Sequence, residues 1–153
     1  MAKRPRDRAH LISISRLLVR DGTEVSVQRF RGTVRQATLH DFESRLREGG
    51  ERSPFYVVDL SEVDYMEAPG LGRLLEQSAV QERRGGWLRV VAPSPAVAMI
   101  FQLTGVTDSL VVAPTEEDAL RDLPGRAAGA GTARDAARPD PPPPSAARPA
   151  RAL

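Results

Sequence analysis

The chain of 153 residues is long enough for one domain with flanking segments, and its 41% hydrophobic residues, with only 5% aromatic, predict a mainly aliphatic core. It has no cysteine, which excludes disulfides, thiolate metal sites and a cysteine nucleophile. The formal charge of +2 divides into +3 for residues 1–9, +3 for residues 123–153 and −4 for the stretch between, and such an acidic body argues against a nucleic-acid-binding fold.

From residue 10 onward, apolar runs typical of strands alternate with amphipathic stretches typical of helices. In chain order the predicted elements are an edge strand at 10–20, a strand at 25–32, a helix from Thr38 to Arg47, a buried strand at 55–60, a helix from Pro69 towards Gly85, a buried strand at 87–92, a helix at 95–104, a short strand at 110–113 and a final helix from Thr115.

Local signals place the ends of several elements. Asp21-Gly22 is a turn signal between the first two strands. Thr38, followed three residues later by Asp41, resembles a capping box, and Gly49-Gly50 is expected to end that helix. For the later helices the expected boundary residues are Ser94 and Thr115 as N-caps and Gly105 as the end of the third helix.

Strands alternating with helices predict an α/β domain over residues 10–122, with a mixed, mostly parallel sheet of about five strands and about four helices. Residues 1–9 form a basic N-terminal extension. The Pro/Ala/Arg-rich residues 123–153 predict a disordered tail, because they contain too few large apolar side chains to offset the entropy of ordering. No apolar run approaches the roughly 20 residues of a membrane span, so we expect a cytoplasmic protein that does not contact the membrane.

The stretch DYMEAPGLGRLLE joins the central strand to the next helix and is the most informative turn of the chain. Pro69 suits the first helical position, which makes Ala68 the expected N-cap, and the charge of Glu67 can partly replace the missing cap. The turn could be only a helix start, a surface for a partner, or an anion site. The third glycine of the dinucleotide pattern is replaced by Leu75, and Glu67 would repel a phosphate.

No set of catalytic residues emerges, so no enzyme activity, cofactor or metal is expected. The two histidines, His10 and His40, lie in no motif with a nucleophile. Asp59, Glu62 and Asp64 cluster around the end of the central strand, and we interpret them as solvent-facing groups, with Asp59 partly buried and hydrogen-bonded.

Three segments resemble one family. VVDLSEVDYMEAPGLGRLL resembles the signature of STAS domains, which include the bacterial anti-sigma factor antagonists; there, Asp-Leu-Ser and an apolar pair precede Asp-Ser-Ser-Gly-Leu-Gly at the start of a helix. APSPAVAMIFQLTGVTDSLVVAPTEEDAL is similar to the later half of the family. FRGTVRQATLHDF is similar to the place where the family has Gly-Glu-Leu-Asp followed by Thr-Ala. Together these segments cover nearly all of residues 10–122.

The resemblance implies a protein that binds an anti-sigma factor, often a serine kinase of the histidine-kinase ATPase fold, and so frees a sigma factor. In the family, that kinase phosphorylates the serine just before Gly-Leu-Gly and breaks the complex. The resemblance leaves a homodimer open. The alternative is a STAS scaffold or transporter-associated subunit outside any sigma-factor pathway.

The chain departs from the family pattern at the switch itself. The signature Asp corresponds to Glu67, the first Ser to Ala68 and the phosphorylated Ser to Pro69, while the Asp of an earlier loop corresponds to Arg35. Since proline has no hydroxyl group, we expect no phosphorylation there. The expected partner-binding residues are Arg35, Glu67, Ala68, Pro69, Gly70, Leu71, Gly72 and Arg73.

Overall fold

The computed structural model describes residues 10–91 and 93–123. The predicted extension at 1–9 and the predicted tail from residue 124 lie outside the described residues. The chain divides into two compact units, residues 1–18 with 24–121 and residues 19–23 with 122–153. The candidate site lies within the first unit.

The described residues form strands and helices in the predicted order. The strands are β1 (Leu11–Arg20), β2 (Thr23–Val34), β3 (Phe55–Met66), β4 (Trp87–Val91) and β5 (Val111–Ala113). The helices are α2 (Gln36–Glu51), α3 (Ala68–Arg83), α4 (Pro95–Thr104) and α5 (Glu116–Ala119), with a 3-10 turn η1 at Val106–Asp108. Both β2 and β3 continue beyond their predicted ends, so the turn of interest begins at the very end of a long strand.

The strands form one sheet in the order β1-β2-β3-β4-β5. The pairs β2–β3, β3–β4 and β4–β5 are parallel. Only two residues, Asp21 and Gly22, join β1 to β2, and their φ angles of 55° and 82° are those of a type I′ hairpin turn, which makes this pair antiparallel. The predicted mixed, mostly parallel α/β sheet is confirmed.

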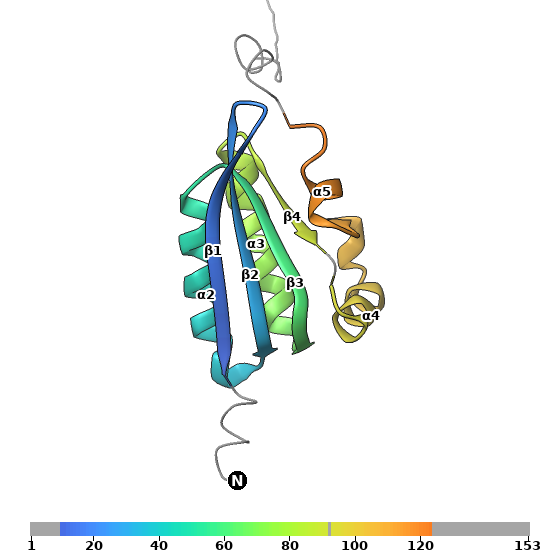
Figure 1. Ribbon diagram of the computed structural model, residues 1–153. Coiled ribbons are helices and arrows are strands. Elements are labelled where there is room, and N and C mark those ends of the chain that lie inside the picture. The colour runs from blue at the N-terminus through green and yellow to red at the C-terminus, as the bar shows by residue number, and fades with distance from the viewer. Residues whose placement is uncertain (1–9, 92, 124–153) are drawn as a thin grey trace, which may run out of the picture. The chain divides into compact units, whose positions relative to one another are not determined.

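Helices cover the two faces of the sheet unequally. In Figure 1, α2 and α3 lie behind β1, β2 and β3, whereas α4 and α5 lie to the right, beside β4. The face of β1 and β2 that points to the viewer therefore carries no described helix. We call this surface the open face; its side chains on β1 and β2 are Ile12, Ile14, Arg16, Val27, Arg29 and Arg31.

The first helix begins earlier than the sequence predicts. Arg35, with an extended backbone, is the N-cap of α2, and Thr38 is the third helical residue. The Thr38 hydroxyl accepts a hydrogen bond from the Arg35 N–H (2.9 Å) and donates one to the Thr33 carbonyl (2.9 Å). Naming Thr38 as the N-cap was wrong because its side chain points back to hold the preceding loop, as the third residue of a capping box does.

The same helix also ends later than predicted, at Glu51. Gly49 and Gly50 lie inside α2 and are both buried. A Cβ on Gly49 would collide with the side chains of Gln28 and Tyr56, and one on Gly50 with Gln77 and Gln81. These glycines are therefore used for close packing and not to end the helix. By contrast, the other predicted boundary residues, Ser94, Gly105 and Thr115, are confirmed.

Tyr56 is fully buried, and its hydroxyl donates a hydrogen bond to the Gln28 side-chain oxygen. Burial raises the pKa of Tyr56 well above 10, although nearby Arg52 lowers it. As the pH rises, the Tyr56 hydroxyl therefore ionises in the unfolded chain before it does in the folded one. Its contribution to the free energy of unfolding is complete below about pH 10 and falls above that by about 1.4 kcal/mol per pH unit.

We expect the free energy of unfolding of wild type, measured by denaturant titration, to show this alkaline slope and that of Tyr56→Phe to lack it. An equal slope in both proteins would contradict the assignment.

Candidate functional site

The candidate site lies where β2 and β3 end and their helices begin. Since the two strands are parallel, their carboxyl ends lie at the same edge of the sheet, with Val34 paired to Met66. Arg35 and Glu67 are the next residues of the two segments and occupy equivalent places, as the N-caps of α2 and α3. The Glu67 N–H donates to the Val34 carbonyl (2.9 Å), which ties the two turns together.

Glu67 caps the neighbouring helix and not its own. Its backbone carbonyl accepts the first hydrogen bond of α3, from the Gly70 N–H. Its carboxylate accepts a hydrogen bond (2.9 Å) from the N–H of Gln36, which is the first residue of α2. The prediction of Ala68 as N-cap was therefore wrong by one residue, because Glu67 still has an extended backbone. Glu67 thus holds the starts of two helices together.

We expect Glu67→Ala to lower the free energy of unfolding by about 1–2 kcal/mol, because it removes a hydrogen bond from a charged acceptor and leaves the Gln36 N–H without a protein partner. Glu67→Gln is the matched control, since its amide oxygen can still accept that bond. Chemical denaturation of the three proteins tests this role. Equal losses in the two variants would show that the charge near the helix ends matters and the hydrogen bond does not.

Arg35 is exposed, and its guanidinium carbon lies 5.2 Å from the centre of the Tyr65 ring, a cation–π contact. Among the described residues it makes no ion pair. Arg35 and Tyr65 line the end of a groove that continues along the open face past Arg31 to Ile12. The Tyr65 ring therefore holds the Arg35 guanidinium group in an exposed position, where a partner could contact it.

The first turn of α3 begins exposed and then becomes buried. Ala68 and Pro69 are exposed, whereas Gly70 and Leu71 are buried. A Cβ on Gly70 would lie 2.8 Å from a methyl carbon of Val34 and 2.9 Å from a Met66 side-chain carbon, so the helix start needs glycine there. At Gly72 a Cβ would meet nothing within 4 Å. Packing therefore explains the glycine at position 70 but not the glycine at position 72.

Arg73, the last predicted contact residue, links the two helices. Its Nε lies 3.5 Å from the Glu43 carboxylate of α2 and its Nη1 3.8 Å from Glu76 on the next turn of α3. The Nε makes no hydrogen bond in the described structure, so this is an ion pair without hydrogen-bond geometry. The guanidinium group is half-buried, and part of its charge is already balanced within the domain.

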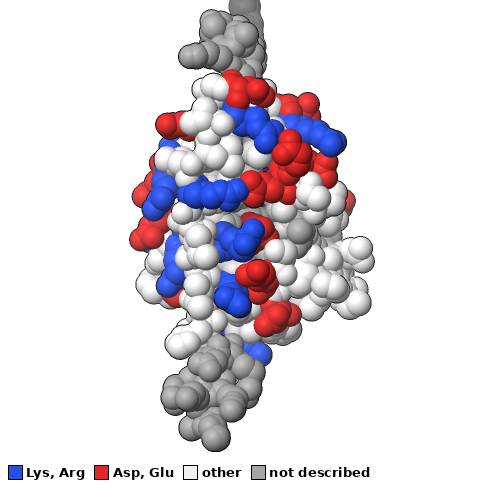
Figure 2. Space-filling model, in the orientation of Figure 1, with Lys and Arg blue, Asp and Glu red and all other residues white. Residues whose placement is uncertain are grey.

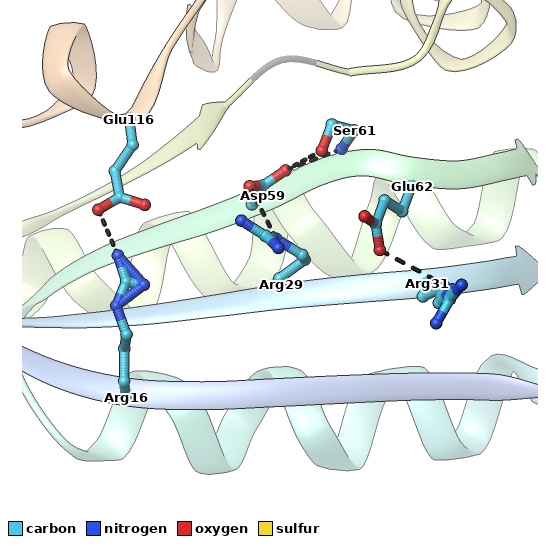
Figure 3. A network of polar contacts seen from close by, with 7 residues as sticks. All are labelled: Arg16, Arg29, Arg31, Asp59, Ser61, Glu62 and Glu116. Carbon is cyan, nitrogen blue, oxygen red and sulfur yellow. Dashed lines mark hydrogen bonds and ion pairs between the residues drawn. The ribbon is translucent and has the colours of Figure 1, made fainter.

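Charge pairs cross the open face in a pattern that the sequence does not reveal. Figure 2 shows arginines next to acidic groups over this surface, and Figure 3 shows the pairs in detail. Arg16 of β1 pairs with Glu116 of α5, Arg29 with Asp59 (3.2 Å) and Arg31 with Glu62 (3.8 Å).

Asp59 is buried and also accepts hydrogen bonds from the Ser61 N–H (2.9 Å) and hydroxyl (2.7 Å), as expected for this residue. Its neighbours Glu62 and Asp64 are exposed, also as expected. In the described part of the chain, no cluster of histidine, aspartate or glutamate could hold a metal ion.

The family model described as "STAS domain" matches residues 16–119. The chain belongs to the STAS family. Its described STAS domain contains no helix long and apolar enough to cross a membrane.

Solved structures agree with this assignment. An anti-sigma factor antagonist from Mycobacterium paratuberculosis is 28% identical over 71% of this chain and 92% of that chain, with a TM-score of 0.60. The anti-sigma factor antagonist SpoIIAA in its unphosphorylated form is 21% identical over 70% of this chain and 93% of that one (TM-score 0.55). The murine anion transporter Slc26a9 is 16% identical over 74% of this chain but only 22% of its own (TM-score 0.59). The last two likenesses show the fold alone.

Proposed function

We propose that this STAS domain is a non-enzymatic regulator that binds an anti-sigma factor and cannot be switched off by phosphorylation at the usual position. The supporting observation is the exposed turn at the start of α3, in a domain whose 28% identical relative is an anti-sigma factor antagonist. We define the contact surface as Arg35, Ala68, Pro69, Gly72 and Arg73. This role would place the protein in the cytoplasm.

Gly72 supports a partner at this surface. Glycine inside a helix costs up to about 1 kcal/mol relative to alanine, and here no neighbouring atom requires its small size. A missing side chain beside the exposed Ala68 and Pro69 leaves room for the backbone of another protein to approach α3. The cost in helix stability is then explained by contact with a partner.

The charge of Arg35 indicates what the partner presents. Arg35 makes no ion pair with a described residue, and the carboxylate of Glu67, the equivalent residue of the neighbouring turn, is already bonded to the Gln36 N–H. A basic patch on the partner would therefore be repelled at this point, whereas an acidic one would be attracted. We propose that the anti-sigma factor carries an acidic residue opposite Arg35.

The absence of a hydroxyl at position 69 is tested by restoring one. Wild type and Pro69→Ser are incubated with ATP, Mg²⁺ and an anti-sigma kinase that binds the protein, and intact masses are measured. Wild type should gain no phosphate on the peptide that contains residues 67–73, whereas Pro69→Ser should gain one there and lose affinity for the kinase.

A wild-type protein that is phosphorylated on α3 or its preceding turn would contradict the proposal. Failure of every candidate anti-sigma factor from the same genome to bind folded protein would contradict it as well. Recovery of a transport ATPase or transporter subunit in a pull-down from native cells would favour the alternative of a scaffold outside the sigma-factor pathway. The likeness to Slc26a9 alone supports no such role.

A further inference from the structure

The outer edge of the sheet is formed by a long and largely apolar strand. β1 has ten residues, LISISRLLVR, and in the described residues no strand pairs with its outer side (Figure 1). Exposed large side chains gather on it: Ile12 is 49% exposed, Ile14 67% and Leu17 48%. Proteins usually protect such edges with proline, charged side chains, bulges or short strands. β1 has no proline, and Arg16 is paired with Glu116.

The hairpin determines which backbone groups of β1 point outward. In a two-residue hairpin the residues that flank the turn, here Arg20 and Thr23, exchange both of their hydrogen bonds. Alternation along the strand then directs the N–H and C=O groups of even-numbered residues towards β2. The groups that point away from the sheet belong to odd-numbered residues, among them Ser13, Ser15 and Leu17.

The far end of the hairpin agrees with this register. If Arg20 faces Thr23, then Leu11 faces Gly32 in an unbroken ladder. A Cβ on Gly32 would indeed lie against the backbone of His10 and Leu11. Gly32 itself has a φ of 118°, so the ladder is irregular at this end, and the alternation of inward and outward groups applies from Ile12 towards the turn.

We propose that the outer edge of β1 pairs antiparallel with β1 of a second copy, about a two-fold axis at Ser15. In this register Ser15 faces Ser15 of the other copy and both exchange their outward N–H and C=O groups. Arg16 faces Ile14 of the other copy, so the two arginines are not placed opposite one another. The pairing uses the strand from Ile12 to Leu18, and a two-fold axis normal to the sheet keeps both open faces on one side.

A second copy fits this edge better than a partner recognised by charge. The charged residue in the middle of β1, Arg16, already has its acidic partner, so this part of the strand offers no unpaired charge to select a charged ligand. What the edge offers is a row of backbone groups and aliphatic side chains, and β1 itself presents the same two features in return. The inference does not depend on the proposed function and is tested on the protein alone.

Sedimentation velocity of the full chain should show a dimer that dissociates on dilution. Ile14→Lys adds charge on the open face, and Ser15→Pro removes an outward N–H without affecting a bond to β2; each should abolish the dimer. Met99→Lys is the matched control, because Met99 is 60% exposed on α4, and it should leave the dimer unchanged. A monomer at all concentrations, or a dimer lost only in Met99→Lys, would overturn the proposal.

Hydrogen exchange gives a second readout that does not need a variant. Amides of Ser13, Ser15 and Leu17 should be protected at high concentration and exchange freely after dilution. Amides of Ile14 and Arg16, which the hairpin register directs towards β2, should stay protected in both. Protection of the odd-numbered amides in the monomer would show that another segment of the same chain covers the edge, and would overturn the proposal.

Discussion

We expect Gly70→Ala to lower the free energy of unfolding by about 1–3 kcal/mol and Gly72→Ala to raise it by about 0.5–1 kcal/mol. At Gly70 a methyl group would press against Val34 and Met66, which are both fully buried and cannot move aside without disturbing the core. At Gly72 the methyl group enters open space, and alanine is the better helix former. Urea denaturation of wild type and the two variants measures both changes.

Comparison of Gly70→Ala with Gly72→Ala separates a role in packing from a role in binding a partner. If Gly72 is kept for a partner, Gly72→Ala should give a more stable protein that binds its anti-sigma factor less well. A variant that gains stability with unchanged affinity would remove Gly72 from the contact surface. Destabilisation by Gly72→Ala as large as that by Gly70→Ala would contradict the packing difference on which the assignment rests.

We expect Arg35→Glu to weaken binding of the proposed anti-sigma factor at least about tenfold, because it replaces attraction by repulsion at a charge that makes no ion pair with a described residue. The matched control is Arg47→Glu, an exposed arginine on α2 that lies twelve residues further along, or about 18 Å along the helix. Isothermal titration should show the loss for Arg35→Glu alone, with the loss growing as salt is lowered.

Equal effects of the two substitutions would indicate a response to net charge and not a contact at Arg35. Rescue of Arg35→Glu by reversing an acidic residue of the partner to lysine would identify the facing group directly. If no single reversal restores affinity, an acidic residue opposite Arg35 is contradicted. The stability of Arg35→Glu serves as a check, since loss of the contact with Tyr65 should change it only slightly.

Most of the fold could be predicted from the sequence because its signals are local. Alternating and continuous apolar runs gave the strands, and Ser94, Gly105 and Thr115 gave the ends of helices through bonds within one turn. The predictions failed where residues that look like local signals instead contact residues distant in the sequence. Gly49-Gly50 looks like a helix end, yet its glycines make room for side chains from β2, β3 and α3.

The internal contacts of the candidate site were not foreseeable from the sequence. Glu67 looks like a compensating charge for its own helix, but its carboxylate bonds to the Gln36 N–H, 31 positions away. The pair of Arg16 and Glu116 joins residues 100 positions apart. Such contacts depend on how the fold brings distant segments of the chain together, and no spacing along the chain records that.

We propose that this STAS domain binds an anti-sigma factor through the start of α3 and remains bound when ATP is present. The most direct measurement is isothermal titration of the anti-sigma kinase with the full chain, before and after incubation with ATP and Mg²⁺. The account predicts the same dissociation constant in both conditions and no phosphate on residues 67–73. Loss of binding after ATP, with phosphate found on that turn or on α3, would contradict it.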